Sequence, residues 1–246
     1  MSSGKYRSII LGCILYNLLT EMWVHGIIGF MNPILTISLL ILYSTYFLML
    51  EDLIVRYRLH DIPVFLIGII FGLWHETFTT GNNLKADGLY GLDPFVLVVA
   101  NLFWWGIMQT VMARYFANRS FGPRNTDHKK MGRIVWGICL FFNLSAISNY
   151  VKYPEIPVEA YIIVFILIGV LVTLLKYVKK PVQNHEFIRS KFLDILLILH
   201  LALCLGIGLT VGSMANTMST TAFVYWSLLF GVCVIGYWVR NRSISV

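Results

Sequence analysis

Eight long apolar segments alternate with short polar gaps along the chain. They cover approximately residues 8–30, 33–57, 62–80, 94–116, 131–151, 157–178, 191–213 and 220–240. Apolar stretches of about 18 or more residues can cross the hydrocarbon core as helices, which satisfy their own backbone hydrogen bonds. Pro33, Pro94 and Pro157 stand where three of these segments begin, and proline is favoured in the first turn of a helix. The pattern predicts an all-α, polytopic membrane helix bundle with eight transmembrane helices.

Basic residues fall mostly in alternate gaps. Of the 19 Lys and Arg residues, 17 lie in gaps that an even-numbered path puts on one side, and Lys85 and Lys152 lie on the other. Because basic loops are retained in the cytosol, we expect both termini in the cytosol and the loop from Thr77 to Asp93 outside. We expect residues 1–246 to form a single integral membrane domain, in the plasma (cell) membrane.

The composition agrees with this assignment and excludes a soluble globular protein. Hydrophobic residues make up 58% of the chain, charged residues make up 13%, and the mean hydropathy is +0.74. A net charge of +7 would suggest nucleic-acid binding in a soluble protein, but here it follows from the cytosolic loops. Membrane lipid, and no nucleic acid, is therefore the expected partner.

Polar side chains occur inside the first and third segments at one depth. Asn17, Glu21 and His25 are spaced i, i+4 and i+8, which places them on one face of a helix. At a rise of about 1.5 Å per residue, Glu21 lies roughly 20 Å from the cytosolic end of its helix. His75 and Glu76 reach about the same height on the third segment. Two independent segments thus bring carboxylates to the outer half of the membrane.

The fourth and fifth segments add amide side chains to this layer. Asn101 and Asn143 reach the same depth, and Asn101, Trp105 and Gln109 form a second stripe at i, i+4 and i+8. Charged and polar groups inside a bilayer usually face the bundle interior or a wet cavity. The agreement in depth predicts a shared polar cavity that leans toward the outside.

Two glycines are expected to shape this site. Gly68 and Gly72 form a GxxxG pattern on the same helical face as His75 and Glu76. Small residues at this spacing let two helix backbones approach closely. We therefore expect a neighbouring helix to pack beside the histidine and the carboxylate.

Two classes of function fit such a cavity. In an intramembrane enzyme acting on a lipid or membrane-embedded substrate, the catalytic residues would be Glu21, His75 and Glu76, with either carboxylate as general base and the histidine as its partner. The residues expected to bind the ligand are His25, Asn101, Trp105 and Asn143. In a non-enzymatic transport or binding protein, the same groups would hold a cation, a proton or a polar headgroup. A third reading is a structural subunit of a membrane complex, since buried Asn and His can also serve only as packing hydrogen bonds.

Metal binding is another hypothesis for the same residues. His25, His75 and a carboxylate match metal ligands in type, but the chain has no HxxxH or HExxH spacing. No metal ligand is therefore assigned, and no motif identifies a cofactor or a protein partner.

Two short motifs resemble those of one enzyme family. The stretch from Glu51 to Arg56 resembles the EExxxR motif, and the stretch from Phe71 to His75 resembles the FxxxH motif, of the CAAX-protease and bacteriocin-processing (CPBP) membrane family. The resemblance implies a hydrolase in which Glu51 and His75 polarise a water. The second acid is Asp52 rather than Glu, and the third motif, HxxxN, is absent because Cys204 follows His200. From their depths, we expect Glu51 and His75 to lie about 10 Å apart along the membrane normal.

Overall fold

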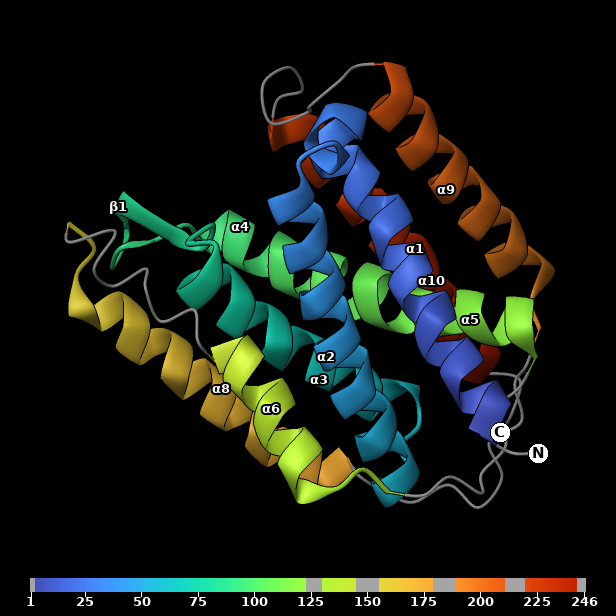
Figure 1. The fold of residues 1–246 in the computed structure, drawn as a ribbon. Helices are drawn as coiled ribbons and strands as arrows, with labels where there is room; N and C mark the ends of the chain where they lie inside the picture. The colour runs from blue at the N-terminus through green and yellow to red at the C-terminus, as the bar shows by residue number, and fades with distance from the viewer. Residues whose placement is uncertain (1–2, 123–129, 145–154, 179–188, 211–219, 243–246) are drawn as a thin grey trace.

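Helices make up almost all of the structure, as the sequence pattern predicts (Figure 1). The computed structural model describes residues 3–122, 130–144, 155–178, 189–210 and 220–242. The elements in chain order are α1 (Ser3–Phe30), α2 (Pro33–Tyr57), α3 (Asp61–Trp74), the π-helix η1 (His75–Thr79), the strand β1 (Leu84–Leu89), α4 (Pro94–Val98), the π-helix η2 (Val99–Met112), α5 (Ala113–Phe121), α6 (Arg133–Leu144), α8 (Val158–Val178), α9 (Lys191–Thr210) and α10 (Thr220–Arg242).

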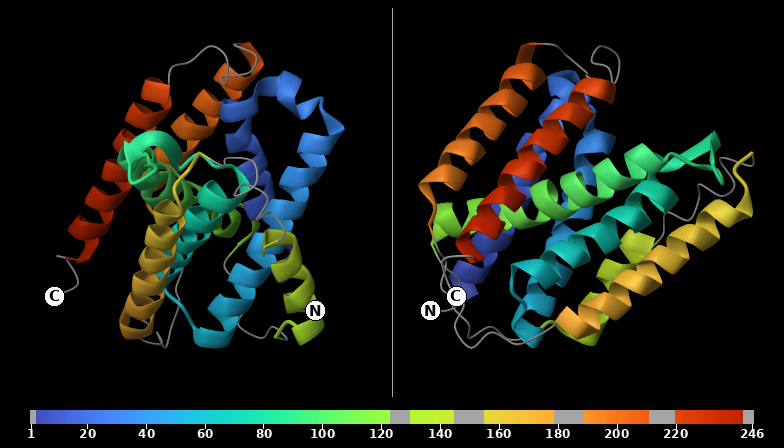
Figure 2. Two further views of the ribbon diagram at one scale, coloured as in Figure 1. Left: turned by 90° about the vertical axis from the view of Figure 1, so that its left-hand side faces the viewer. Right: turned by 180° about the vertical axis from the view of Figure 1, so that it is seen from behind.

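Each predicted apolar segment coincides with one helical rod. Within the described residues, six rods are long and apolar enough to cross a membrane, and α6 and α10 contain shorter apolar stretches. The second half of the predicted fifth segment lies outside the described residues. The all-α class and the membrane-protein character are thus confirmed. The two ends of the chain lie on the same side of the molecule (Figures 1 and 2).

Side-chain caps fix where two of the helices begin. The side chain of Asn32 accepts hydrogen bonds from the backbone N–H of Ile34, at 3.0 Å, and of the next residue, just before α2 starts at Pro33. Asp93 does the same before α4, accepting from the N–H of Phe95 at 3.0 Å. Such caps satisfy backbone donors that have no partner inside the helix. Proline follows each cap because the first helical position needs no N–H.

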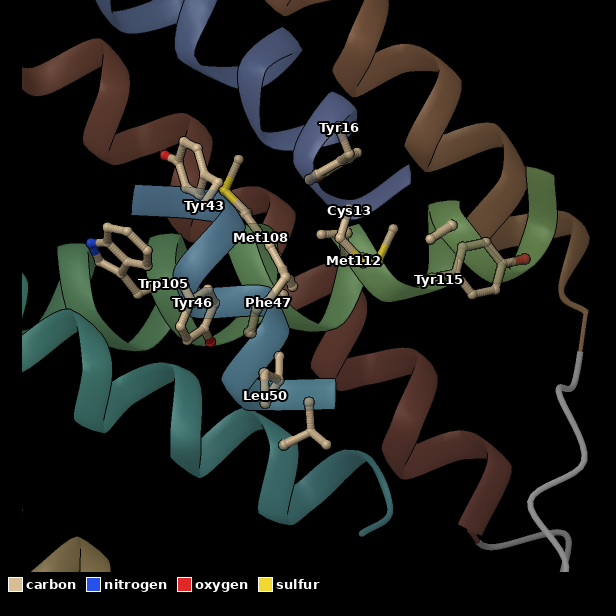
Figure 3. Packing of buried hydrophobic residues seen from close by; sticks show 14 of the residues in the cluster. Cys13, Tyr16, Tyr43, Tyr46, Phe47, Leu50, Trp105, Met108, Met112 and Tyr115 are labelled. Carbon is tan, nitrogen blue, oxygen red and sulfur yellow. The ribbon is translucent and has the colours of Figure 1, made fainter. Parts of the chain in front are cut away.

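The rod formed by α4, η2 and α5 (Pro94–Phe121), here called the central rod, passes through the middle of the bundle (Figure 2). It is the most buried of the six long apolar helices. It packs against α3, α1 and α10, while α9 covers α1, α6 packs on α2 and α8 packs on α3. Figure 3 shows its inner face, where Met108 and Met112 lie among aromatic side chains of α1 and α2.

The predicted close approach beside Gly68 and Gly72 is confirmed. A Cβ atom added at Gly68 would lie 2.6 Å from Oγ1 of Thr110, and one added at Gly72 would lie 2.6 Å from Cβ of Trp105. Both distances are shorter than real Cβ contacts allow. The absence of side chains on α3 therefore lets the central rod pack directly on its backbone.

Two segments are wound as π-helix, which the sequence pattern does not predict. They are η1, which contains His75 and Glu76, and the 14-residue η2, which contains Asn101, Trp105 and Gln109. The i→i+5 winding is rare, and where it occurs as a short bulge it is frequently found at functional sites. Both segments carry polar residues that the sequence analysis assigned to one layer.

The loop of residues 80–93, here called the β1 loop because it contains β1, folds back onto the end of η1. The backbone N–H of Asn83 donates to the carbonyl of Glu76 at 3.1 Å, and the N–H of Asp93 donates to the carbonyl of Asn83 at 3.0 Å. Leu84 and Leu89, at the two ends of β1, each form an isolated antiparallel bridge with Leu92. The loop is therefore attached to the helix end that carries Glu76.

Candidate functional site

Glu21 is a buried carboxylate that three side chains surround. It is only 6% exposed. Its Oε1 accepts a short hydrogen bond from the hydroxyl of Tyr43 and one of 3.2 Å from Nε2 of Gln109. Its Oε2 lies 3.3 Å from Nε2 of His25, one turn along α1. The helical stripe predicted on α1 therefore faces α2 and the central rod.

Glu76 is a second buried carboxylate, also 6% exposed. Its Oε1 accepts from the indole N–H of Trp105 at 2.6 Å. Its Oε2 accepts from Oγ1 of Thr80 at 2.8 Å and from Nδ2 of Asn82 at 2.6 Å. The β1 loop thus supplies two donors, and the central rod supplies the third.

Aromatic side chains join the two carboxylates into one site. The Trp105 ring lies 6.2 Å from the Tyr43 ring and 5.1 Å from the imidazole of His75, between centroids. Figure 3 shows the Tyr43 hydroxyl and the Trp105 indole nitrogen pointing toward the same side. We call this site the acidic cluster, which comprises Glu21, His25, Tyr43, His75, Glu76, Trp105 and Gln109.

Asn101 lies beside the acidic cluster on the same face of the central rod. Its Nδ2 donates to Oδ1 of Asn83 at 3.1 Å, and Nδ2 of Asn83 donates to Oγ1 of Thr77 at 3.0 Å. All three side chains are buried. They connect the central rod to the loop and to the π-helical turn that carries Glu76.

Asn143 lies elsewhere, although the sequence analysis grouped it with these residues. Its Nδ2 donates to Oγ1 of Thr45 at 2.8 Å, and its carbonyl accepts from the indole N–H of Trp74 at 2.9 Å. Depth along a helix gives the height of a side chain but not its direction around the bundle. Asn143 contacts Trp74, which is adjacent to His75 in the sequence, so its predicted height in the bundle agrees with that of His75. It nevertheless belongs to the α2–α3–α6 junction and not to the acidic cluster.

Three amide oxygens at the site are buried without a hydrogen-bond partner among the described residues. They are Oδ1 of Asn17, Oδ1 of Asn101 and Oε1 of Gln109. Asn17 belongs to the same neighbourhood, because its Nδ2 donates to the backbone carbonyl of Gln109 at 3.2 Å. Buried acceptors without donors are uncommon in folded proteins and require an explanation.

The basic side chains near the carboxylates are histidines. Within the described part of the chain, no Lys or Arg forms an ion pair with Glu21 or Glu76. The imidazole of His75 stacks parallel to the ring of Phe71 at 6.0 Å and makes no hydrogen bond to a described residue. No group of three His, Cys, Asp or Glu among the described residues is arranged to hold a metal ion.

The residues of the two CPBP-like motifs have separate partners. Oε1 of the fully buried Glu51 accepts from Nε of Arg114 at 3.0 Å. Asp52 pairs with Arg56 at 2.8 Å and also accepts from Trp136 of α6. His75 instead lies against Trp105, which is nine residues from Arg114 on the central rod.

The sequence analysis missed some of the carboxylate donors. Tyr43 lies in the apolar part of α2, and Thr80 and Asn82 lie after the end of η1, so helical periodicity gives no signal for them. Gln109 was visible as the last member of the stripe that begins at Asn101. The arrangement can stabilise negative charge at two points and can accept a proton or a cation between them.

Comparisons with protein-family models, with curated proteins and with solved structures find no match to this chain. The geometry of the acidic cluster is therefore the basis for inferring a function.

Proposed function

We propose that this chain is a non-enzymatic membrane transport or binding protein whose acidic cluster takes up a cation or a proton. One observation supports this most directly. Glu21 and Glu76 lie in one neighbourhood inside the bundle, and their partners are neutral donors and histidine.

Charge balance favours this proposal. An ionised carboxylate inside a membrane protein is costly unless a positive charge or a proton compensates it. Hydrogen bonds from Tyr43, Trp105 and Thr80 solvate the carboxylates but add no positive charge. A bound cation or proton would supply the compensation, so the site suits a positively charged ligand.

The unpartnered oxygens point to the same class of ligand. Carboxylate and amide oxygens are the ligands that hard cations prefer, and ammonium groups donate hydrogen bonds to the same atoms. Asn17 and Gln109 place such oxygens next to Glu21, and Asn101 places one near the loop that covers Glu76. A cationic ligand would provide what these acceptors lack.

The test is the effect of cations on stability. The thermal unfolding of the purified protein in phosphatidylcholine nanodiscs would be compared across lithium, sodium, potassium and tetramethylammonium chloride at constant ionic strength, and across pH. We expect at least one cation, or protons, to raise the unfolding temperature of the wild type and not that of the Glu21→Gln, Glu76→Gln double variant. Equal responses of the two folded proteins would refute the proposal.

A second candidate is the intramembrane enzyme. The carboxylate of Glu21 orients the imidazole of His25, whose side chain is 31% exposed, and Tyr43 holds the same carboxylate. A histidine held by a carboxylate is the usual form of a general base. The two functions differ at His25: His25→Gln should abolish turnover of a lipid substrate in the enzyme, but should leave cation binding at Glu76 intact in the binding protein.

The remaining expectations belong to this proposal as well. The protein would reside in the plasma membrane with eight spans and both termini in the cytosol, and membrane lipid would be its surroundings. In that orientation the β1 loop, with Thr80 and Asn82, would face the exterior. A ligand would then reach Glu76 from outside.

A further inference from the structure

An apolar groove opens on the side of the bundle, next to the acidic cluster. It has a volume of about 260 Å³ and lies between α2, α3, α6 and α8. Its walls include Met49 and Leu53 of α2, Ile67 and Ile70 of α3, Leu140 of α6 and Ile168 of α8. These helices belong to the apolar, membrane-crossing part of the chain.

Two aromatic side chains separate this groove from the acidic cluster. Tyr46 and Phe71 line the groove, and their rings stack at 4.1 Å between centroids. On its other side, Phe71 contacts the rings of His75 and Trp105, at 6.0 and 5.1 Å. Trp105 in turn donates to Glu76. The wall between groove and carboxylate is therefore only a few aromatic rings thick.

The two wall residues are held differently. The hydroxyl of Tyr46 is bonded to Oγ1 of Thr110 at 2.6 Å, which fixes its ring to the central rod. Phe71 is partly buried, and its ring is held by packing against neighbouring rings and the apolar core. A rotamer change of Phe71 breaks no hydrogen bond, and it would connect the groove to the imidazole of His75.

We propose that the ligand is a lipophilic organic cation, an amine or quaternary ammonium with a hydrocarbon chain, whose head enters the acidic cluster and whose chain lies in the groove past Phe71. This inference rests on the proposed function and names its ligand class. Both carboxylates supply the charge complementary to the head.

The aromatic rings support an organic head rather than a small metal ion. The rings of Tyr43, Phe71 and Trp105 pack against one another beside the carboxylates, and cations without strong hydration bind to aromatic faces. A small inorganic ion would gain nothing from the groove. An amphiphile uses both parts, because its chain replaces lipid in the groove while its head compensates the carboxylates.

The experiment compares three probes in phosphatidylcholine nanodiscs, below the concentrations that dissolve them. Decyltrimethylammonium has the charge and the chain, tetramethylammonium has the charge only, and decyl sulfate has the chain with the opposite charge. Apparent affinities come from the shift of the unfolding temperature with probe concentration. We expect decyltrimethylammonium to bind at least tenfold more tightly than either of the other probes.

Chain partitioning into the bilayer also favours the decyl probes, so variants must separate it from groove binding. Leu140→Trp fills the groove, and Val170→Trp adds the same side chain to an exposed position of α8. We expect Leu140→Trp to weaken decyltrimethylammonium binding about tenfold, to leave tetramethylammonium binding within twofold, and Val170→Trp to change neither. Glu76→Gln should weaken both cations.

Each alternative result has a defined meaning. If Leu140→Trp and Val170→Trp bind decyltrimethylammonium equally, the groove is not the chain site and this inference fails while the proposed function stands. The same conclusion follows if decyl sulfate binds as tightly as decyltrimethylammonium and Glu76→Gln weakens tetramethylammonium alone. If no cation, organic or inorganic, stabilises the folded wild type and pH has no effect, both proposals fail.

Discussion

The indole N–H of Trp105 donates to Oε1 of Glu76 at 2.6 Å, and this bond joins the central rod to the π-helical end of α3. Trp105 is 2% exposed and also contacts Phe71, His75 and Tyr43. It is therefore both a donor to Glu76 and the ring against which the groove-lining Phe71 packs.

Replacing Trp105 with phenylalanine should destabilise the protein by about 1–3 kcal/mol more than a matched control, because a buried carboxylate loses a donor. The control is Trp23→Phe. Trp23 is also buried, and its indole nitrogen has no hydrogen-bond partner among the described residues. Both substitutions remove the same atoms, so the difference isolates the bond to Glu76. Unfolding titrations with SDS would measure it, and equal losses would show that the bond contributes nothing.

Gly72→Ala should be destabilising by about 1–3 kcal/mol, because the new methyl group would meet Cβ of Trp105 at 2.6 Å and force α3 away from the central rod. Gly169→Ala on α8 meets nothing within 4 Å and should be neutral or slightly stabilising. The unfolding temperatures of the two variants give the comparison. A tolerated Gly72→Ala would mean that the two helices are not in close contact.

The ion pair between Glu51 and Arg114 should be sensitive to loss of one partner. Glu51→Gln removes the buried carboxylate 3.0 Å from the Arg114 guanidinium and leaves only the exposed Asp61, at 3.9 Å, as an acidic partner. Breaking a buried pair in this way costs about 3–5 kcal/mol. The double variant Glu51→Leu, Arg114→Met should recover much of that loss, since no charge remains buried. The exposed pair of Lys85 and Asp87 is the control, and Asp87→Asn should have no measurable effect. A double variant as unstable as Glu51→Gln would contradict this.

The membrane orientation can be tested with single cysteines placed in loops. On a background without Cys13, Cys139, Cys204 and Cys233, a cysteine at position 85 should react with an impermeant maleimide added outside intact cells. A cysteine at position 130 should react only after the cells are opened. The physical reason is the retention of basic loops in the cytosol. Preferential labelling at position 130 from outside would invert the topology and the access route to Glu76.

The sequence predicted the helices closely because hydropathy and helix punctuation act locally. The apolar segment at 33–57 matches α2, and the one at 157–178 matches α8. Capping by Asn32 and Asp93 explains why the starts at Pro33 and Pro94 were predicted to the residue. Each of these apolar runs is long and begins next to a capping residue or a proline, so its helix has few alternative starting positions.

The site was predictable in part, because helical spacing specifies a face but not its partner. The stripe of Asn101, Trp105 and Gln109 does lie along one face of the central rod, each residue bonded to a different partner. Nothing in the sequence indicates that Tyr43 donates to Glu21, since that contact depends on how α1 and α2 cross. Asn143 shows the limit of depth alone, because it bonds to Thr45 and Trp74 and lines the apolar groove instead of contacting the carboxylates.

The π-helical winding of η2 sets the rotational phase between the two ends of the central rod. An i→i+5 pattern has more residues per turn than the 3.6 of an α-helix, so the 14 residues of η2 complete fewer turns. If one turn changed to α-helical winding, Arg114 would rotate relative to Asn101 about the rod axis. Such a change would therefore alter the angle about the rod axis between the side chain that donates to Glu76 and the one that pairs with Glu51.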